Sequence, residues 1–177
     1  MIRLFVAIPL PQNVIEHLLL MQRGVPGARW TTREQFHLTL RFIGNVDERM
    51  AAAVDDALAG ISAPGFTLAL SGIGTFGGKN PRQLWVGVRD GEALCHLQRK
   101  TETAMQRIGL EPEGRKFTPH VTLAKLKAAP GGRILDFIAD HSLYASAPFD
   151  VKEFILYSSV LTPNGSIYQP ERHYPLR

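Results

Sequence analysis

A four-residue pattern, His-x-Thr-Leu, occurs twice in this chain, beginning at residue 37 and again at residue 120. Each copy lies in a short, mainly apolar run that is typical of a β-strand. Because side chains at positions i and i+2 of a strand share a face, His37 and Thr39 point one way, and so do His120 and Thr122. The apolar residues between and after them point the other way, toward a core. We therefore expect two strands that each present an imidazole and a hydroxyl group.

This combination of side chains suits acid/base chemistry on a phosphate group. One imidazole can accept a proton while the other donates one. Threonine hydroxyls can donate hydrogen bonds to phosphoryl oxygens. A single His-x-Thr in a strand is usually only part of a polar sheet face, but two copies, each followed by leucine, favour the functional interpretation.

The bulk composition is that of an ordinary folded protein, with 45% hydrophobic and 20% charged residues in 177. This length allows one domain or two small lobes that share a cleft. The N-terminal apolar stretch is too short for a signal peptide, and no apolar run approaches the length of a membrane span, so we expect no membrane partner. The single cysteine, Cys95, excludes an internal disulfide and favours a reducing, cytoplasmic location. A net charge of +4 mildly favours anionic partners such as nucleic acid.

Hydrophobic periodicity predicts alternating strands and helices without an internal linker. The expected strands, besides the two that carry histidine, are 3–8, 66–70, 83–88, 151–160 and 167–174, and the expected helices are 13–23, 47–61, 92–108 and 134–139. Strand, helix, histidine strand and helix follow one another in the first half, and a similar order recurs in the second. We interpret residues 1–177 as a single α+β domain of two similar lobes, with the histidine strands lining a groove between them.

The segment Gly72–Gly77 matches the glycine pattern of dinucleotide-binding folds. That pattern requires a helix to begin at the glycines, so that its N-terminus meets the pyrophosphate. Here Lys79, Asn80 and Pro81 are followed by a strand instead. We therefore expect no nucleotide cofactor and interpret the segment as a flexible loop between two strands, bordering the groove.

Other histidines offer weaker candidates. Cys95 and His96 resemble a nucleophile and its base, but neighbours on a helix point about 100° apart and would not face each other. His17 and His141 are expected at the surface, and His173 has no assigned role. A metal site on His37 and His120 would need a third ligand, and neither has a histidine or carboxylate at ligand spacing, so no metal is expected.

The paired motifs resemble the two-histidine phosphoesterase superfamily, and more closely the RNA 2′,3′-cyclic phosphodiesterase family, whose members are also called 2′-5′ RNA ligases. The resemblance covers nearly the whole chain. It rests on Arg3-Leu4-Phe5-Val6-Ala7-Ile8, on His37-Leu38-Thr39-Leu40-Arg41-Phe42-Ile43-Gly44, on Leu84-Trp85-Val86-Gly87-Val88 and on Phe117-Thr118-Pro119-His120-Val121-Thr122-Leu123-Ala124-Lys125. One departure is Lys125, where members often have arginine. The glycines at 72–77 also fall where members carry a glycine-rich stretch.

This resemblance implies a two-lobed α+β fold with pseudo-twofold symmetry. It also implies metal-independent hydrolysis of a terminal 2′,3′-cyclic phosphate on RNA to a 2′-phosphate, and in some members the reverse joining of RNA ends through a 2′-5′ bond. His37, Thr39, His120 and Thr122 fall on the catalytic positions of the family.

The mechanism that we expect needs no nucleophilic side chain, because water can attack the cyclic phosphate directly. One histidine would draw the proton from water and the other would protonate the departing 3′ oxygen. The two threonines would hold the non-bridging oxygens. The sequence leaves open which histidine is the base and which is the acid.

Three further residues are candidates for substrate binding: Arg41, Lys125 and Phe117. Simple alternation favours Arg41, which lies four positions after His37, over Lys125, which lies five after His120, unless a bulge intervenes. Phe117 or Trp30 could stack on a terminal base, although core packing is the commoner fate of an aromatic side chain.

Two alternatives remain open at this point. The protein could be a related phosphoesterase that acts on a small cyclic nucleotide or an ADP-ribose cyclic phosphate. It could also be an RNA- or nucleotide-binding module without turnover, although arginine or lysine would serve simple binding as well as two intact His-Thr pairs. The sequence does not indicate the oligomeric state.

Overall fold

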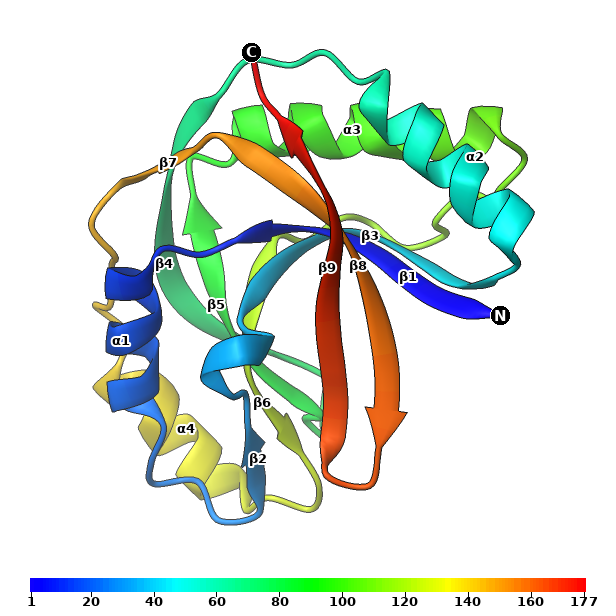
Figure 1. Ribbon diagram of the computed structural model, residues 1–177. Coiled ribbons are helices and arrows are strands. Elements are labelled where there is room, and N and C mark those ends of the chain that lie inside the picture. The colour runs from blue at the N-terminus through cyan, green and yellow to red at the C-terminus, as the bar shows by residue number, and fades with distance from the viewer.

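The computed structural model describes residues 1–177 as two antiparallel sheets flanked by helices (Figure 1). The first sheet has the order β3 (His37–Val46), β1 (Ile2–Pro9), β8 (Glu153–Thr162) and β9 (Gly165–Pro175). The second has the order β2 (Ala28–Trp30), β6 (His120–Leu126), β5 (Gln83–Arg89), β4 (Phe66–Phe76) and β7 (Phe149–Val151). Each sheet contains one histidine motif, so the α+β architecture predicted from the sequence is confirmed.

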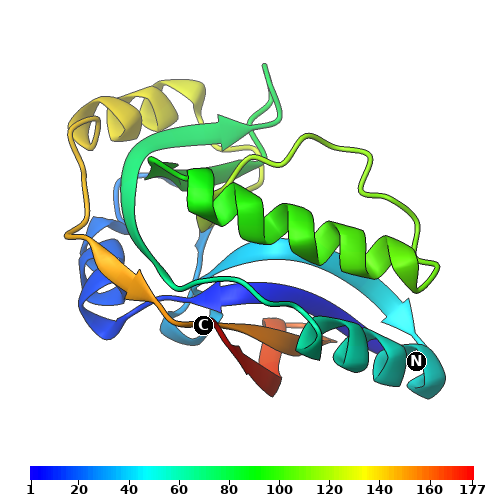
Figure 2. The same cartoon turned by 90° about the horizontal axis from the view of Figure 1, so that it is seen from above.

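Four α-helices lie in two pairs at opposite ends of the molecule (Figures 1 and 2). One end carries α1 (Gln12–Met21) and α4 (Gly131–Asp140), and the other carries α2 (Glu48–Ala59) and α3 (Glu92–Arg107). Helix α2 packs on β1 and β9, and α3 packs on β3 and β4. A short 3-10 turn, η1 (Arg33–Gln35), precedes β3. None of the helices combines the length and apolar character needed to cross a bilayer.

Local sequence explains the helices well. Asp47 caps α2, because its carboxylate accepts a hydrogen bond from the backbone N–H of Met50 at 2.7 Å. Helix α3 buries a regular apolar stripe that includes Leu94, Leu97 and Met105. Gly109, with a φ of +93°, follows its C-terminus in the left-handed conformation that glycine adopts readily.

One continuous core of 34 buried hydrophobic residues extends through both sheets. The apolar residues of the two motifs, Leu38 and Leu40 in β3 and Val121 and Leu123 in β6, all belong to it. In both strands, as predicted, the apolar residues of the motif lie on the buried face and the histidine and threonine lie on the other face.

The glycine-rich segment differs from the prediction, because it is not a loop. Residues 72–76 continue β4, which pairs with β5 as far as Phe76 opposite Gln83. Gly74 makes room for a side chain: a Cβ atom there would lie 2.4 Å from two ring atoms of Trp85. The actual turn is 77–82, and no helix begins at the glycines, so the dinucleotide pattern lacks its required context.

A β-bulge follows the threonine in both motif strands. In the first sheet Thr39 pairs with Ala7 but Arg41 pairs with Val6, so Leu40 is the extra residue. In the second sheet the same irregularity leaves Leu123 as the extra residue, at the equivalent place in its motif. Because an extra residue reverses the alternation of the strand beyond it, side chains four positions after each histidine change faces.

Candidate active site

His37 is fixed at both ring nitrogens. Its Nδ1 atom lies 2.7 Å from the carbonyl oxygen of Gln35, and its Nε2 atom lies 3.0 Å from the hydroxyl oxygen of Thr39. Because a carbonyl oxygen can only accept, Nδ1 carries the proton of the neutral ring and donates it. Nε2 is then the basic nitrogen, and the Thr39 hydroxyl donates to it.

His120 repeats this arrangement in the second sheet. Its Nδ1 atom lies 2.7 Å from the carbonyl oxygen of Thr118, again the residue two positions upstream. The same reasoning assigns the proton of the neutral ring to Nδ1 and leaves Nε2 as the basic nitrogen. Both motifs therefore hold their imidazole in the same tautomer by the same local backbone geometry.

Aromatic rings enclose both imidazoles. The His37 ring lies 4.9 Å from the ring of Phe5 and 5.2 Å, edge-on, from that of Tyr168. The His120 ring lies 4.8 Å, also edge-on, from that of Phe76 and 6.0 Å from that of Trp85. These contacts restrict the rotation of both imidazoles and leave each of them only partly exposed to water.

This enclosure makes both imidazoles weak bases. Burial lowers the pKa of His37 to about 4, and repulsion from His120 lowers that pKa further, against the opposing effect of the hydrogen bond to Gln35. Burial also lowers the pKa of His120, and the hydrogen bond to Thr118 opposes that shift. The mutual repulsion shows that the two rings lie within electrostatic reach, and β3 and β6 contact each other. Because the pKa of His37 is lowered strongly, His120 is the better candidate to carry a single proton on the pair.

The second threonine has a different partner from the first. The Oγ1 atom of Thr122 accepts a hydrogen bond from the side-chain amide of Gln83 at 2.5 Å, which leaves its own proton free for a ligand. Sequence reasoning missed Gln83. Alternation in the predicted strand 83–88 could have identified it, since it places Gln83 and Trp85 on one face.

The bulges reverse the expected roles of Arg41 and Lys125. The prediction that Arg41 shares the face of His37 is wrong: its side chain is only 8% exposed and its Nε atom forms an ion pair with Glu102 of α3 at 2.7 Å. Lys125 pairs with Gln83, whose side chain reaches Thr122, so Lys125 lies on the face of its motif. In the first sheet the equivalent residue is Phe42, which is 58% exposed and has its ring 6.0 Å from that of Phe5.

Phe117 and Trp30, the two aromatic candidates for base stacking, both pack against other side chains of the protein. Phe117 is partly buried against the core. Trp30 packs on Phe137 of α4, with ring centroids 5.8 Å apart. Phe42 is more exposed than either and was not identified from the sequence.

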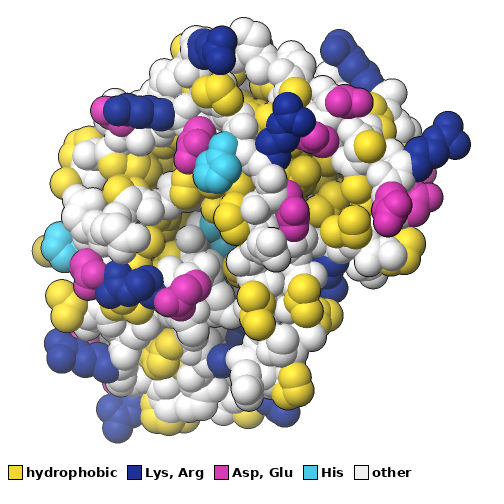
Figure 3. Space-filling model, viewed as in Figure 1, with side chains coloured by type: hydrophobic (Ala, Val, Ile, Leu, Met, Phe, Trp, Pro, Cys, Tyr) yellow, Lys and Arg dark blue, Asp and Glu magenta, His cyan; other side chains and the backbone are white.

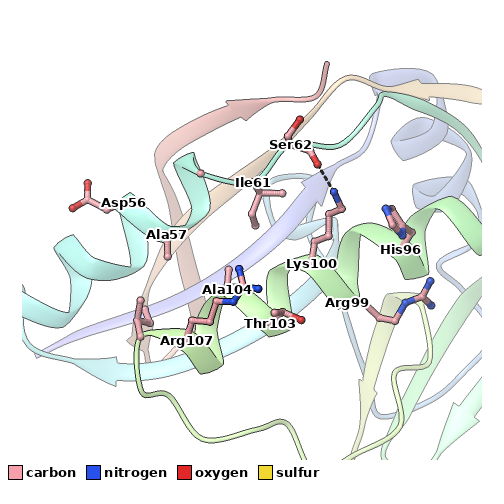
Figure 4. A pocket seen from close by; sticks show the side chains of 12 residues that line it. Asp56, Ala57, Ile61, Ser62, His96, Arg99, Lys100, Thr103, Ala104 and Arg107 are labelled. Atoms are coloured by element: carbon pink, nitrogen blue, oxygen red, sulfur yellow. Dashed lines mark hydrogen bonds between the residues drawn. The ribbon is translucent and has the colours of Figure 1, made fainter.

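The remaining histidines lie outside this site. His17 and His96 are exposed on helices, and His173 pairs with Glu153 at 3.1 Å. No group of three metal-ligating side chains occurs in the structure. A hollow of about 580 Å³ lies between α2 and α3 and contains none of the motif residues (Figure 4). It is lined by basic side chains that include Arg99, Lys100 and Arg107.

Charge on one face of the molecule is dispersed rather than gathered in one place. On the face drawn in Figure 3, lysine and arginine side chains are scattered, with aspartate and glutamate among them.

Comparison with known proteins agrees with this geometry. The sequence matches the LigT-like phosphoesterase family twice, over residues 8–85 and 86–168, and each match contains one histidine motif. A protein of Aeropyrum pernix named RNA 2′,3′-cyclic phosphodiesterase is 36% identical over 82% of this chain and 84% of its own length. A Thermotoga maritima protein of the same name is 32% identical over 94% of this chain and 91% of its own length.

A solved structure supports the same relationship. Escherichia coli LigT complexed with 3′-AMP superposes with a TM-score of 0.79 at 28% sequence identity, over 99% of this chain and 98% of that protein. The likeness extends over both sheets and both motifs. Two imidazoles in matching environments, two threonines beside them and a family match to each half lead to one conclusion: the chain belongs to the LigT-like phosphoesterase family.

Proposed function

We propose that the protein hydrolyses the 2′,3′-cyclic phosphate at the end of an RNA to a 2′-phosphomonoester, without a metal ion, by acid/base catalysis of His37 and His120. The observation that carries this proposal is the matching pair of imidazoles, each held by the carbonyl two residues upstream and followed by a threonine two residues on. The names of the curated relatives support the choice of substrate. Because each half supplies one pair, residues 1–177 would act as one catalytic domain.

We assign the base to His37 and the acid to His120. A base must be neutral, and the low pKa of His37 keeps it so. An acid must carry a proton, and a proton shared by the two rings is held by His120. The Nε2 atom of His37 then takes a proton from the attacking water, while the Nε2–H group of His120 gives one to the departing 3′ oxygen.

The threonines orient the phosphate between the rings. The Thr122 hydroxyl accepts from Gln83 and is left to donate to a non-bridging oxygen. The Thr39 hydroxyl donates to His37 in the free protein, and turning toward the phosphate would release Nε2 for its role as a base. Substrate binding and activation of the base are thereby linked at one hydroxyl group.

Lys125 and Phe42 are the substrate contacts that we favour, because the bulges place them at equivalent positions on the motif faces. The ammonium group of Lys125 supplies a point charge for phosphate. The exposed ring of Phe42 supplies a surface on which a base can stack. Phe117 supports the segment before His120 through its contact with the core.

The same geometry would also permit 2′-5′ ligation. A 5′-hydroxyl of a second RNA end would take the place of water, give its proton to His37 and displace the same 3′ oxygen. No additional residue is required, so we propose ligation as a minor reaction of the same site.

The test uses an oligoribonucleotide that ends in a 2′,3′-cyclic phosphate, with EDTA present. The native protein should release a 2′-phosphate, and either His37→Ala or His120→Ala should abolish turnover. A 3′-phosphate product, or activity that EDTA removes, would contradict the proposal. Turnover of 2′,3′-cyclic mononucleotides or an ADP-ribose cyclic phosphate, with none on RNA, would instead establish the small-substrate alternative. Binding of RNA without any turnover would establish the binding-module alternative.

A further inference from the structure

The segment 111–119, which leads directly into His120, has no secondary structure to fix its conformation. It contains no helix or strand, and none of its residues takes part in a backbone–backbone hydrogen bond. Yet the carbonyl group of Thr118, at its end, is the acceptor that fixes the His120 ring. Something outside the segment must therefore keep this carbonyl in place.

The polar contacts between this segment and the body of the protein come from one buried ion pair. Arg41 of β3 donates to the carbonyl oxygen of Glu111, and its Nη1 atom lies 3.6 Å from the carboxylate of Glu113. Glu102 of α3, which pairs with Arg41 at 2.7 Å, accepts from the backbone N–H of Glu113 at 3.0 Å. Each member of the pair thus holds one part of the segment.

Burial makes this pair stronger than a surface ion pair. The side chain of Arg41 is 8% exposed and that of Glu102 is 17% exposed, so the attraction between them is little screened by water. Arg41 also donates to the carbonyl oxygen of Phe42 at 3.1 Å, which fixes the guanidinium against its own strand. The planar fork of arginine allows these contacts at once, and lysine could not make all of them.

We propose that Arg41 and Glu102 are positioning residues that hold the segment 111–119 and thereby orient the imidazole of His120. The pair connects the strand of the first histidine motif to the approach of the second. This inference rests on the proposed function for its kinetic consequence, while the structural consequence, the state of the His120 ring, is independent of it.

Three variants test the proposal: Arg41→Met, Glu102→Met and the two combined. The single variants leave one charge buried without its partner, whereas the combined variant removes both and should fold. Asp55→Asn is the matched control, because it removes the charge that pairs with Arg172, at 2.5 Å, at the opposite edge of the same sheet.

The direct measurement is the tautomer of each histidine by nitrogen NMR. In the native protein both neutral rings should carry their proton on Nδ1. In the combined variant His120 should become a mixture of tautomers while His37 is unchanged, and trypsin should cleave after Arg115 or Lys116 more rapidly. The kcat on the cyclic phosphate should fall about 10- to 100-fold with little change in KM, and Asp55→Asn should alter none of these properties.

Two results would overturn the proposal. Faster cleavage by trypsin with an unchanged His120 tautomer and kcat would mean that the pair holds the segment without orienting the ring. An unchanged rate of cleavage would mean that the pair does not hold the segment. Absence of turnover by the native protein would count against the proposed function instead, because the NMR comparison does not depend on activity.

Discussion

At the scale of single residues, three kinds of neighbour set the chemical properties of the two imidazoles. A backbone carbonyl selects the tautomer, aromatic rings lower the pKa, and a threonine lies beside the reacting nitrogen or next to it on the strand. The sequence alone identified both histidines and both threonines, because the repeated motif lies on predicted strands. It did not identify Gln83 or the aromatic rings around His37, because those come from strands distant in the chain.

The pH dependence of the reaction follows from these environments. As pH rises through about 4, His37 becomes neutral and kcat/KM should rise. As pH rises further, His120 loses its proton at a pKa below the ordinary 6.5, and kcat/KM should fall. We therefore expect a bell-shaped profile with its maximum between these values, measured by initial rates on a cyclic mononucleotide. A rate that increases steadily from pH 5 to pH 9 would contradict the two-imidazole mechanism.

Replacing Gly74 by alanine should displace the Trp85 ring and, through it, the His120 ring. The new methyl group would overlap the Trp85 ring, which lies 6.0 Å from the His120 ring. We expect the free energy of unfolding to fall by about 1–3 kcal/mol, and kcat to fall as the ring shifts. Urea denaturation and kinetics measure the two effects. Gly131→Ala in α4, where the added Cβ meets nothing within 4 Å, is the control and should lower neither quantity.

At the scale of the strands, the bulges decide which side chains reach the substrate. Strand alternation correctly placed every motif residue as far as the threonine, and failed at the next residues because Leu40 and Leu123 are extra in their ladders. A bulge depends on pairing with a neighbouring strand, so a single strand carries little sign of it. Residues 72–76 were misassigned for a related reason, since the Trp85 ring that Gly74 accommodates belongs to the next strand.

The bulges predict that Phe42 and Lys125 act on substrate binding, whereas Arg41, next to Phe42 in the sequence, does not. Phe42→Ala should raise KM on RNA several-fold with little loss of stability, because its ring is 58% exposed on the motif face. Lys125→Gln should likewise raise KM, and Lys125→Arg should preserve binding. Arg41 substitutions should act on stability and kcat instead. Steady-state kinetics with thermal unfolding separates these outcomes, and a KM effect confined to Arg41 would show that the alternation is unbroken.

At the scale of the whole molecule, each of the two sheets carries one histidine motif. The sequence predicted this organisation from the repeated order of elements, and the two family matches divide the chain in the same way. The short edge strands β2 and β7, each three residues long, were not predicted, because they form only by pairing with the second sheet.

Burying His37 should make the stability of the whole fold dependent on pH. Its pKa is lowered in the folded state, so the unfolded chain binds the proton more tightly. Stability that is present above pH 6.5 should be lost as pH falls toward 4, by about 2–3 kcal/mol from this residue. Comparing urea denaturation of the native protein with that of His37→Gln isolates the effect. If the free energy of unfolding depended on pH equally in the two proteins, the ring would not be buried as described.

The division of labour between the two histidines is tested most directly with a cyclic substrate whose 3′ bridging oxygen is replaced by sulfur. A thiolate departs without a proton, because its conjugate acid has a far lower pKa than an alcohol, so it needs no general acid. We predict that His120→Ala, inactive on the oxygen substrate, recovers most of its activity on the sulfur substrate, whereas His37→Ala remains inactive on both. Recovery by His37→Ala alone would reverse the two roles, and recovery by neither variant would contradict the account of two histidines acting as base and acid.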